Sequence, residues 1–131
     1  MPLKSRDLAV KAAEAALSKK AIDVTILDLS GLTVIADYFV ICSGDSTTHV
    51  KAISRFIEEE LAKKHQKLLS SEGVAYSHWI LLDYGDVIVH IFEKETRAYY
   101  NLEKLWMDAK IMEINEDKSN MAREDKRAIH P

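Results

Sequence analysis

The sequence predicts an α/β (α+β) fold, in which helices pack on a mixed β-sheet. Segments with helical and strand periodicity follow one another in the order α, β, β, α, β, β, β, α. The four glycines, at positions 31, 44, 73 and 85, all fall between these segments, so independent local signals agree on the boundaries. The passage from residue 37 to about residue 75 is strand–helix–strand and predicts one right-handed crossover. Together these observations predict a single layered sheet structure.

The first half of the chain predicts two helices and two strands. Ser5 is positioned to cap a helix that ends near Lys19 and Lys20. Segments 23–29 and 37–44 are short and β-branched, as expected of strands, and the second is apolar enough to be buried. A second helix is expected after Gly44, capped by Asp45, Ser46 or Thr47, with an apolar face made by Val50, Ile53, Phe56 or Ile57, and Leu61.

The second half predicts a hairpin between a weak strand and a final helix. Residues 68–75 are the weak strand or loop, and residues 78–93, "HWILLDYGDVIVHIFE", are two apolar strands joined by a tight turn. Thr96 is expected to cap the last helix, "RAYYNLEKLWMDAK". We therefore assign residues 1–109 to one domain. Residues 110–131 form a charged extension that we expect to be mobile when unbound.

Size and charge restrict the classes of function. A chain of 131 residues and 14.9 kDa fits one domain with one core, and 47% hydrophobic with 30% charged residues is a globular balance. The net charge of −3 and the pI near 5.9 disfavour a protein that holds nucleic acid through its overall field. A mildly acidic surface suits a basic protein partner instead.

Cysteine usage and hydropathy predict the compartment. Cys42 is the single cysteine, so no internal disulfide can form and a reducing compartment is expected. Its apolar context favours a small buried side chain over a reactive thiol. The N-terminal segment has no uninterrupted apolar stretch, and no apolar run approaches transmembrane length. We expect a cytoplasmic protein without membrane contact.

The two faces of the hairpin differ in chemistry. If Tyr84 and Gly85 form a two-residue turn, Asp83 opposes Asp86, and Trp79 opposes His90 at the far end. One face is then apolar throughout and should pack under the helices; it contains Ile80, Leu82, Val87, Val89 and Ile91. The other face has an apolar middle and polar margins, as protein interfaces do; it contains Trp79, Leu81, Asp83, Asp86, Ile88, His90 and Phe92.

Metal binding and nucleophilic catalysis have little support. His78 and His90 fall on opposite faces of the predicted hairpin and cannot share an ion, and no HxH, HExxH or CxxC spacing occurs. Ser43, Ser46 and His49 lie close in sequence, but no acidic residue is placed to orient the histidine. A helix cap is the simpler interpretation of Ser46, and we predict neither a metal nor another cofactor.

A nucleotide-dependent enzyme is the alternative function. The corner from Gly44 to Ser46 joins a strand to a helix N-terminus, where phosphates bind, and two acidic residues follow later in the chain. This is the outline of a nucleotidyltransferase, whose Mg²⁺ needs closely spaced carboxylates on one strand face. Asp83 and Asp86 straddle a turn instead, so catalytic acids are not evident. An RNA-binding adaptor is a third possibility, which scattered basic residues disfavour.

Three segments resemble a known family. "ADYFVICSGDSTTHVKAI", "HWILLDYGDVIVHIF" and "RAYYNLEKLWMDA" are similar to the ribosomal silencing factors, the iojap-like family of bacteria and organelles, over residues 22–109. The resemblance implies a nucleotidyltransferase-like topology without catalysis, cofactor or small-molecule substrate. It implies binding to the large ribosomal subunit at its intersubunit face, through large-subunit protein fourteen. That binding would block joining of the small subunit and repress translation under nutrient limitation, and it implies a homodimer as a further state.

The resemblance also carries site residues to this chain. Trp79 and Tyr84 would anchor the partner, while Asp83 and Asp86 would pair with its Lys or Arg side chains. Thr48 stands where the family often has Arg, so the contact of that Arg does not transfer. Core packing is expected for Tyr100, Leu102 and Leu105, and either packing or contact for Trp106. The expected partner-binding residues are Trp79, Asp83, Tyr84, Asp86, His90, Asp37, His49 and Arg97.

Overall fold

A computed structural model describes residues 3–113, which form six strands and four helices. No helix in this part of the chain is long and apolar enough to cross a membrane. The elements follow the predicted order as far as the third helix. In chain order they are α1 (Ser5–Ser18), β1 (Ile22–Asp28), β2 (Tyr38–Gly44), α2 (Thr47–Lys63), β3 (Ser70–Glu72), β4 (Trp79–Asp83), β5 (Val87–Glu93), α3 (Lys94–Tyr100), α4 (Leu102–Leu105) and β6 (Lys110–Glu113).

All six strands belong to one mixed sheet, in the order β3-β4-β5-β2-β1-β6. The central pair β2 and β5 is parallel, and the other four pairs are antiparallel. Helix α2 joins β2 to β3, which run in the same direction because β3 and β5 both pair antiparallel with β4. The mixed α+β sheet and its crossover connection are therefore confirmed, while the hand of the crossover stays a prediction.

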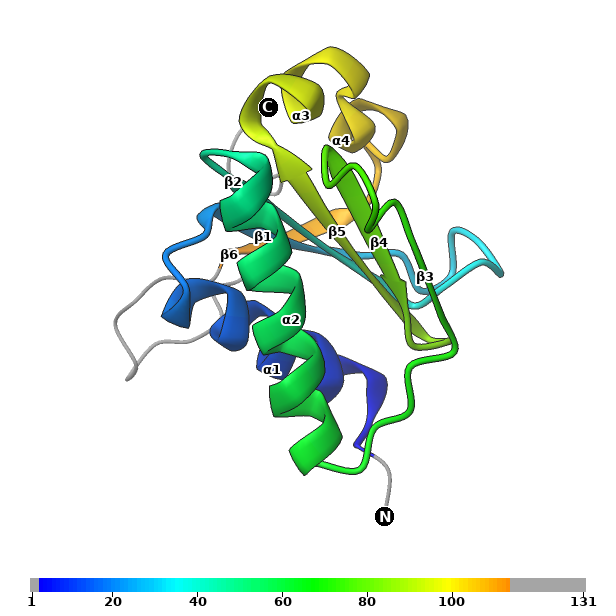
Figure 1. The fold of residues 1–131 in the computed structure, drawn as a ribbon. Helices are drawn as coiled ribbons and strands as arrows, with labels where there is room; N and C mark the ends of the chain where they lie inside the picture. Colours follow the sequence, from blue (N-terminus) through cyan, green and yellow to red (C-terminus); the bar gives the residue numbers. More distant parts are fainter. Residues whose placement is uncertain (1–2, 114–131) are drawn as a thin grey trace.

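Helices α1 and α2 lie together on one face of the sheet and bury the main core (Figure 1). Helix α1 contributes small side chains, Ala9, Ala12, Ala13 and Ala16, which let the helix approach the strands closely. Helix α2 buries the predicted stripe of Val50, Ile53, Ile57 and Leu61. Ser46 caps α2, because its side chain accepts the backbone N–H of His49 at 3.1 Å. Ser5 is not a cap: α1 begins at Ser5 after Lys4, which makes no side-chain capping bond.

The C-terminal part of the structure differs from the single predicted helix. Asn101 adopts a left-handed conformation, with φ of 46°, and separates α3 from α4. The chain then forms β6, which pairs with β1 along the edge of the sheet. The sheet thus extends to Glu113, four residues beyond the predicted domain end at Ala109. The prediction of a mobile extension concerns residues that, from 114 onward, lie outside the described part of the chain.

Candidate protein-binding face

The turn of the β4–β5 hairpin lies one residue later than predicted. Leu82 pairs with Val89 and Asp83 with Ile88, and the Tyr84 N–H donates to the Val87 carbonyl at 2.9 Å. The two turn residues are therefore 85 and 86. Gly85 has a φ of 93°, a conformation that a two-residue hairpin turn demands and that Tyr84 would adopt only with strain.

This register separates the two aspartates that were expected to oppose each other. Asp83 turns back on the hairpin, where its Oδ1 accepts the Gly85 N–H at 2.7 Å. Asp86 occupies the turn itself and is exposed. The predicted Asp83–Asp86 opposition is wrong, and Asp83 instead stabilises the turn. Because the register moves by two positions, every side chain keeps its predicted face.

The apolar face of the hairpin is confirmed as part of the main core. Its five members, Ile80, Leu82, Val87, Val89 and Ile91, are fully buried beneath α1 and α2. Tyr84 belongs to this core as well and is only 9% exposed. Burial, with Glu58 nearby, raises the pKa of its phenol above the ordinary value. Tyr84 therefore packs inside the protein and is not positioned as a partner anchor.

The opposite face of the sheet carries an aromatic cluster, which comprises Phe39, Trp79, His90, Phe92, Tyr100 and Trp106. Trp79 lies at its centre, stacked on Phe92 with ring centroids 4.7 Å apart and contacting Tyr100 at 5.0 Å. The short helices α3 and α4 contribute no buried residue to this side of the sheet, where Leu29, Ala36 and Ala109 also pack in the cluster. The cluster is a second, smaller core that stays partly open to solvent.

His90 lies inside this cluster and not at an exposed margin. It is 4% exposed, and its Nδ1 accepts the indole N–H of Trp79 at 3.1 Å. Its ring proton must then lie on Nε2, which is buried and has no hydrogen-bond partner among residues 3–113. Burial lowers the pKa of His90 to about 4, so the imidazole is neutral near pH 7. Because β5 is covered on both faces, His90 is not accessible to a partner.

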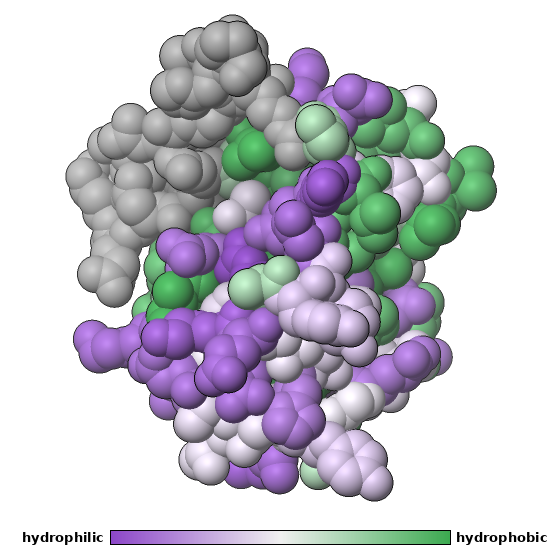
Figure 2. Space-filling view, turned by 90° about the horizontal axis from the view of Figure 1, so that it is seen from above, coloured by the Kyte–Doolittle hydropathy of each residue, from purple (hydrophilic) through white to green (hydrophobic). Residues whose placement is uncertain are grey.

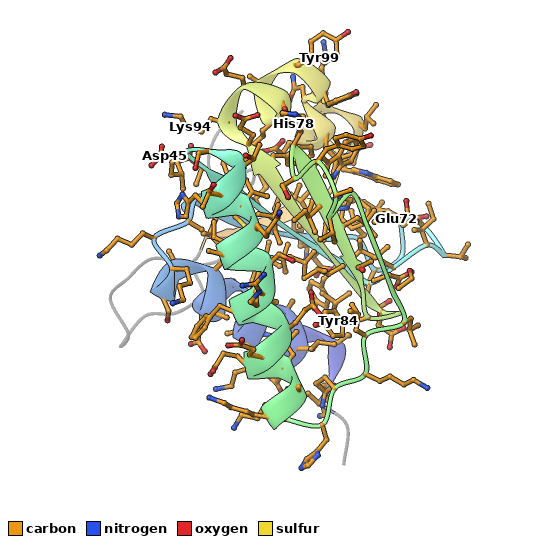
Figure 3. The ribbon with its side chains drawn as sticks, in the orientation of Figure 1. Asp45, Glu72, His78, Tyr84, Lys94 and Tyr99 are labelled. Atoms are coloured by element: carbon orange, nitrogen blue, oxygen red, sulfur yellow. The ribbon has the colours of Figure 1, made fainter. Side chains whose placement is uncertain are left out.

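Several large apolar side chains of the β1–β2 loop and of residues 99–107 are exposed. Tyr99 is 81% exposed and Leu105 is 74% exposed, which corrects the expectation that Leu105 packs in the core. Figure 2 shows most of the visible hydrophobic surface gathered at the right of that view, and Figure 3 shows Tyr99 at the far end from Tyr84. We call this surface the aromatic face; its exposed members are Leu32, Val34, Ile35, Tyr99, Tyr100, Leu105 and Met107.

Sequence reasoning missed most of the aromatic face. A continuous last helix would place Tyr99, Leu102 and Leu105 on one apolar stripe, but the break at Asn101 separates them. Leu102 is partly buried against the second core, as is Trp106, whereas Tyr100 is 54% exposed beside Trp79. The asparagine was the available signal, since Asn adopts the left-handed conformation more readily than most residues.

An acidic rim adjoins the apolar loop between β1 and β2. The backbone N–H groups of Asp37 and Tyr38 donate to the Asp86 carbonyl at 2.7 and 3.1 Å, so the hairpin turn and the loop end are held together. The Leu29 N–H donates to the Asp37 carbonyl at 2.7 Å and closes the loop. Three of the expected partner-binding residues, Asp37, Asp83 and Asp86, thus lie at one end of the sheet. Exposed Val34 and Ile35 belong to the loop that this contact closes.

Arg97 joins the secondary-structure elements internally. Its Nε and Nη2 donate to Glu103 Oε2 at 3.0 and 2.7 Å, and its Nη1 donates to Ser43 Oγ at 2.9 Å and to the Asp23 carbonyl at 2.8 Å. The side chain is 13% exposed. Arg97 therefore ties α3 and α4 to β1 and β2, which makes it a structural residue.

His49 also acts within the fold. Its Nδ1 accepts the Asp45 N–H at 2.9 Å, which leaves Nε2 to donate to the Lys19 carbonyl at 2.8 Å. The ring thereby connects the start of α2 to the end of α1. Of the eight expected partner-binding residues, six have their side chains engaged in packing or internal hydrogen bonds: Tyr84, His90, Arg97, His49, Asp83 and Trp79.

The two halves of the alternative enzyme site lie at opposite ends of the sheet. In the parallel β2–β5 pair, Gly44 aligns with Glu93, whereas Tyr38 aligns with Val87 beside the hairpin turn. Six residues of extended strand separate these positions, which is about 20 Å. Asp86 therefore cannot act with the corner from Gly44 to Ser46. Among residues 3–113 no group of three or more His, Cys, Asp or Glu side chains is placed to hold a metal ion.

The fold and this face define a small α+β domain with an exposed apolar surface on one side of its sheet. Comparisons with known proteins then give the family. A model of the family described as "Ribosomal silencing factor during starvation" matches residues 2–130. The ribosomal silencing factor RsfS of Bacillus subtilis is 43% identical over 104 residues, which are 79% of this chain and 88% of that protein. The chain belongs to the ribosomal silencing factor family.

Further relatives and solved structures agree. RsfS of Halalkalibacterium halodurans is 40% identical over 112 residues, covering 86% of this chain and 96% of that protein. The chloroplastic Iojap protein of Zea mays is 37% identical over 106 residues, 81% of this chain and 46% of that protein. A crystal structure from Chromobacterium violaceum superposes with a TM-score of 0.78 at 32% identity, covering 80% of this chain and 88% of the other. One from Bacillus halodurans gives 0.71 at 40% identity, covering 77% and 94%.

Proposed function

We propose that this protein represses translation by binding the large ribosomal subunit at its intersubunit face, where it blocks joining of the small subunit under nutrient limitation. The partner on the subunit is large-subunit protein fourteen, and the protein works in the cytoplasm without catalysing a reaction. One observation carries the proposal: a family member presents a sheet face with exposed apolar and aromatic side chains, with Trp79 near one end of the face and the exposed Asp86 of the hairpin turn at the other end.

Steric exclusion needs only a rigid domain held at the right place. The aromatic face combines large apolar side chains with carboxylates at its edge, the composition of a hot-spot region with a polar rim. Asp86 is exposed and free to pair with Lys or Arg of a basic ribosomal protein. The structure therefore favours Trp79, Asp37 and Asp86 as contacts over the buried Tyr84 and His90.

The test is a subunit-joining assay with purified large subunits, combined with co-sedimentation to measure binding. The wild-type protein should bind large subunits and slow joining, and Trp79→Ala and Asp83→Lys should weaken both effects. A wild-type protein that neither binds large subunits nor slows joining would contradict the proposal. Because Trp79 also packs on Phe92 and Asp83 stabilises the turn, both variants need surface-only counterparts.

Leu105→Ala and Asp86→Lys are those counterparts. Both side chains are exposed, so neither substitution should unfold the domain. Each should weaken binding about tenfold or more, in line with loss of one apolar or charged interface contact. Ala62→Ser, exposed on α2 on the opposite side of the sheet and uncharged, is the matched surface control for folding. If Leu105→Ala and Asp86→Lys both bind large subunits as tightly as the wild-type protein, the aromatic face does not contact the subunit.

The proposal includes a homodimer as a further state and a nucleotidyltransferase-like topology that has no transferase activity. Analytical ultracentrifugation with Leu105→Ala tests whether the aromatic face also joins two copies. Calorimetry with nucleotide and Mg²⁺ tests the enzyme alternative, which requires micromolar binding that Asp83→Asn abolishes. The separation of Gly44 from Asp86 along β5 predicts no such binding.

A further inference from the structure

The two helices of the main layer carry an excess of positive charge that the net charge of the chain conceals. Residues 4–20 and 47–67, which contain α1, α2 and the turns after them, include ten Lys or Arg and five Asp or Glu. Residues 21–46 and 68–112 include four Lys or Arg and eleven Asp or Glu. Since α1 and α2 together cover one face of the sheet (Figure 1), the charge is divided between two sides of the molecule.

Much of the positive charge on the helical layer is not neutralised within the fold. Two of the ten side chains form ion pairs on their own helix, Lys11 with Glu14 at 3.7 Å and Lys63 with Glu60 at 2.8 Å. Six others form no ion pair among residues 3–113, namely Lys4, Lys20, Lys51, Arg55, Lys64 and Lys67. All six are exposed, so their charge is available to a partner.

The concentration of charge is sharpest where the end of α1 meets the first half of α2. The His49 ring bonds the Lys19 carbonyl at 2.8 Å, and the Lys19 ammonium lies over the Phe56 ring, 4.8 Å from its centroid. Lys51 and Arg55 are one turn apart on the outer surface of this part of α2. We call Lys19, Lys20, Lys51 and Arg55 the basic corner.

Nothing acidic in the first half of α2 offsets this corner. Residues 47–57 contain no Asp or Glu, and the first turn of α2 is without an acidic residue, although acidic side chains are usually favoured there. Asp45, just before the cap, pairs with Lys94 at 3.4 Å (Figure 3).

We propose that the basic corner contacts the phosphate backbone of ribosomal RNA when the protein is bound to the large subunit. The inference rests on the proposed function, which assigns the protein partner to the acidic and aromatic side. A partner rich in phosphate complements the opposite sign of charge on the helical layer. Lys and Arg side chains on an exposed helix bind phosphate groups whatever the neighbouring base. This contact would therefore orient the protein on the RNA without recognising a nucleotide sequence.

The first test compares the salt dependence of binding to purified large subunits. Each lost phosphate contact should reduce the slope of log affinity against log salt by about 0.7–0.9, so Lys51→Gln with Arg55→Gln should reduce it by about 1.5. The matched control is Lys104→Gln with Lys110→Gln, two exposed lysines outside the helical layer, which should leave the slope unchanged. If the double variant has the same slope of log affinity against log salt as the wild-type protein, this inference is wrong and the proposed function is unaffected. If the wild-type protein does not bind large subunits at all, the proposed function is wrong.

The second test identifies the chemical class of the neighbour. Ala52 is exposed beside Lys51, and Cys42 is fully buried, so Ala52→Cys places a single accessible thiol at the basic corner without removing a charge. A photo-crosslinker on this thiol, in complex with large subunits, should form cross-links to ribosomal RNA. Cross-links to ribosomal protein alone, or none while binding is intact, would overturn the inference. Wild-type protein treated with the same reagent is the blank.

Discussion

The indole N–H of Trp79 donates to Nδ1 of His90 at 3.1 Å, between neighbouring strands that do not align these residues directly. Trp79 aligns with Phe92, and His90 aligns with Leu81, so the hydrogen bond is diagonal. It determines the tautomer of a buried imidazole and the orientation of the side chain at the centre of the aromatic face. The stability of the second core and the shape of the candidate binding face are therefore linked through one contact.

Trp79→Phe should destabilise the protein although it preserves an aromatic ring. The substitution removes the indole donor to His90 Nδ1 and leaves a buried acceptor unpaired, at a cost of about 1–3 kcal/mol. Urea unfolding followed by circular dichroism measures this loss. Tyr99→Phe, on an exposed ring of α3, is the control and should change the free energy of unfolding little. Equal stability of Trp79→Phe and wild type would show that the hydrogen bond contributes nothing.

Stability should fall with acid because His90 is buried in its neutral form. Its pKa is lowered to about 4 in the folded protein, whereas an unfolded histidine titrates at about 6.5. Between these values the unfolded chain binds the extra proton, so the free energy of unfolding decreases as the pH falls from about 6.5 to about 4. The difference corresponds to about 3 kcal/mol as an order of magnitude. Below about pH 4 this contribution does not change further.

The His90→Phe variant isolates that contribution. It cannot titrate at this position, so its stability should decline less than that of the wild type over the same range. Urea titrations at about pH 7 and about pH 4.5 give the two differences. If both proteins lose the same stability, the acid sensitivity comes from other groups and His90 is not responsible.

Cys42 should be unreactive in the folded protein. Its side chain is fully buried in the main core, and burial raises its pKa to about 12, so almost no thiolate exists at neutral pH. A colourimetric thiol reagent should modify it only at the rate of unfolding and should react at once in denaturant. Ala52→Cys, with its exposed thiol, provides the positive control. Rapid modification of the wild-type protein without denaturant would contradict the burial of Cys42.

Gly73→Ala should be far more damaging than Gly85→Ala. Both glycines have positive φ, 82° and 93°, so each substitution carries a backbone cost of about 1–2 kcal/mol. At Gly73 the added methyl group would also collide with the Trp79 carbonyl oxygen, which is backbone and cannot rotate away. At Gly85 the nearest atom is a flexible Leu69 methyl at 3.4 Å. Thermal unfolding compares the two variants, and equal destabilisation would contradict the close approach at Gly73.

Local signals were sufficient for much of the architecture. Period-two alternation assigned Ile80, Leu82 and Val89 to the core face before any register was known, because a strand places alternate side chains on opposite faces. The cap at Ser46 and the buried stripe of α2 depend on residues within one or two turns. Such features are encoded by neighbours in the chain, and so is the family resemblance of the three motifs.

The candidate site was predicted less completely, since burial depends on distant elements. His90 and Trp79 share a strand face with Asp83, and nothing in the hairpin sequence indicates which of them α3 and α4 will shield. Tyr84 was expected at the surface because it was assigned to the turn; one residue of difference in the turn position placed it in the main core.

By itself the sequence determined the order of elements as far as the third helix, the two faces of the hairpin strands and the family to which the chain belongs. These properties follow from local periodicity and from contiguous motifs. Tertiary structure alone decided that β6 completes the sheet, that His90 is enclosed while Leu105 is exposed, and that the basic side chains of α1 and α2 collect opposite the acidic rim. Each of these depends on which residues far apart in the chain exclude water together, a quantity that no local window contains.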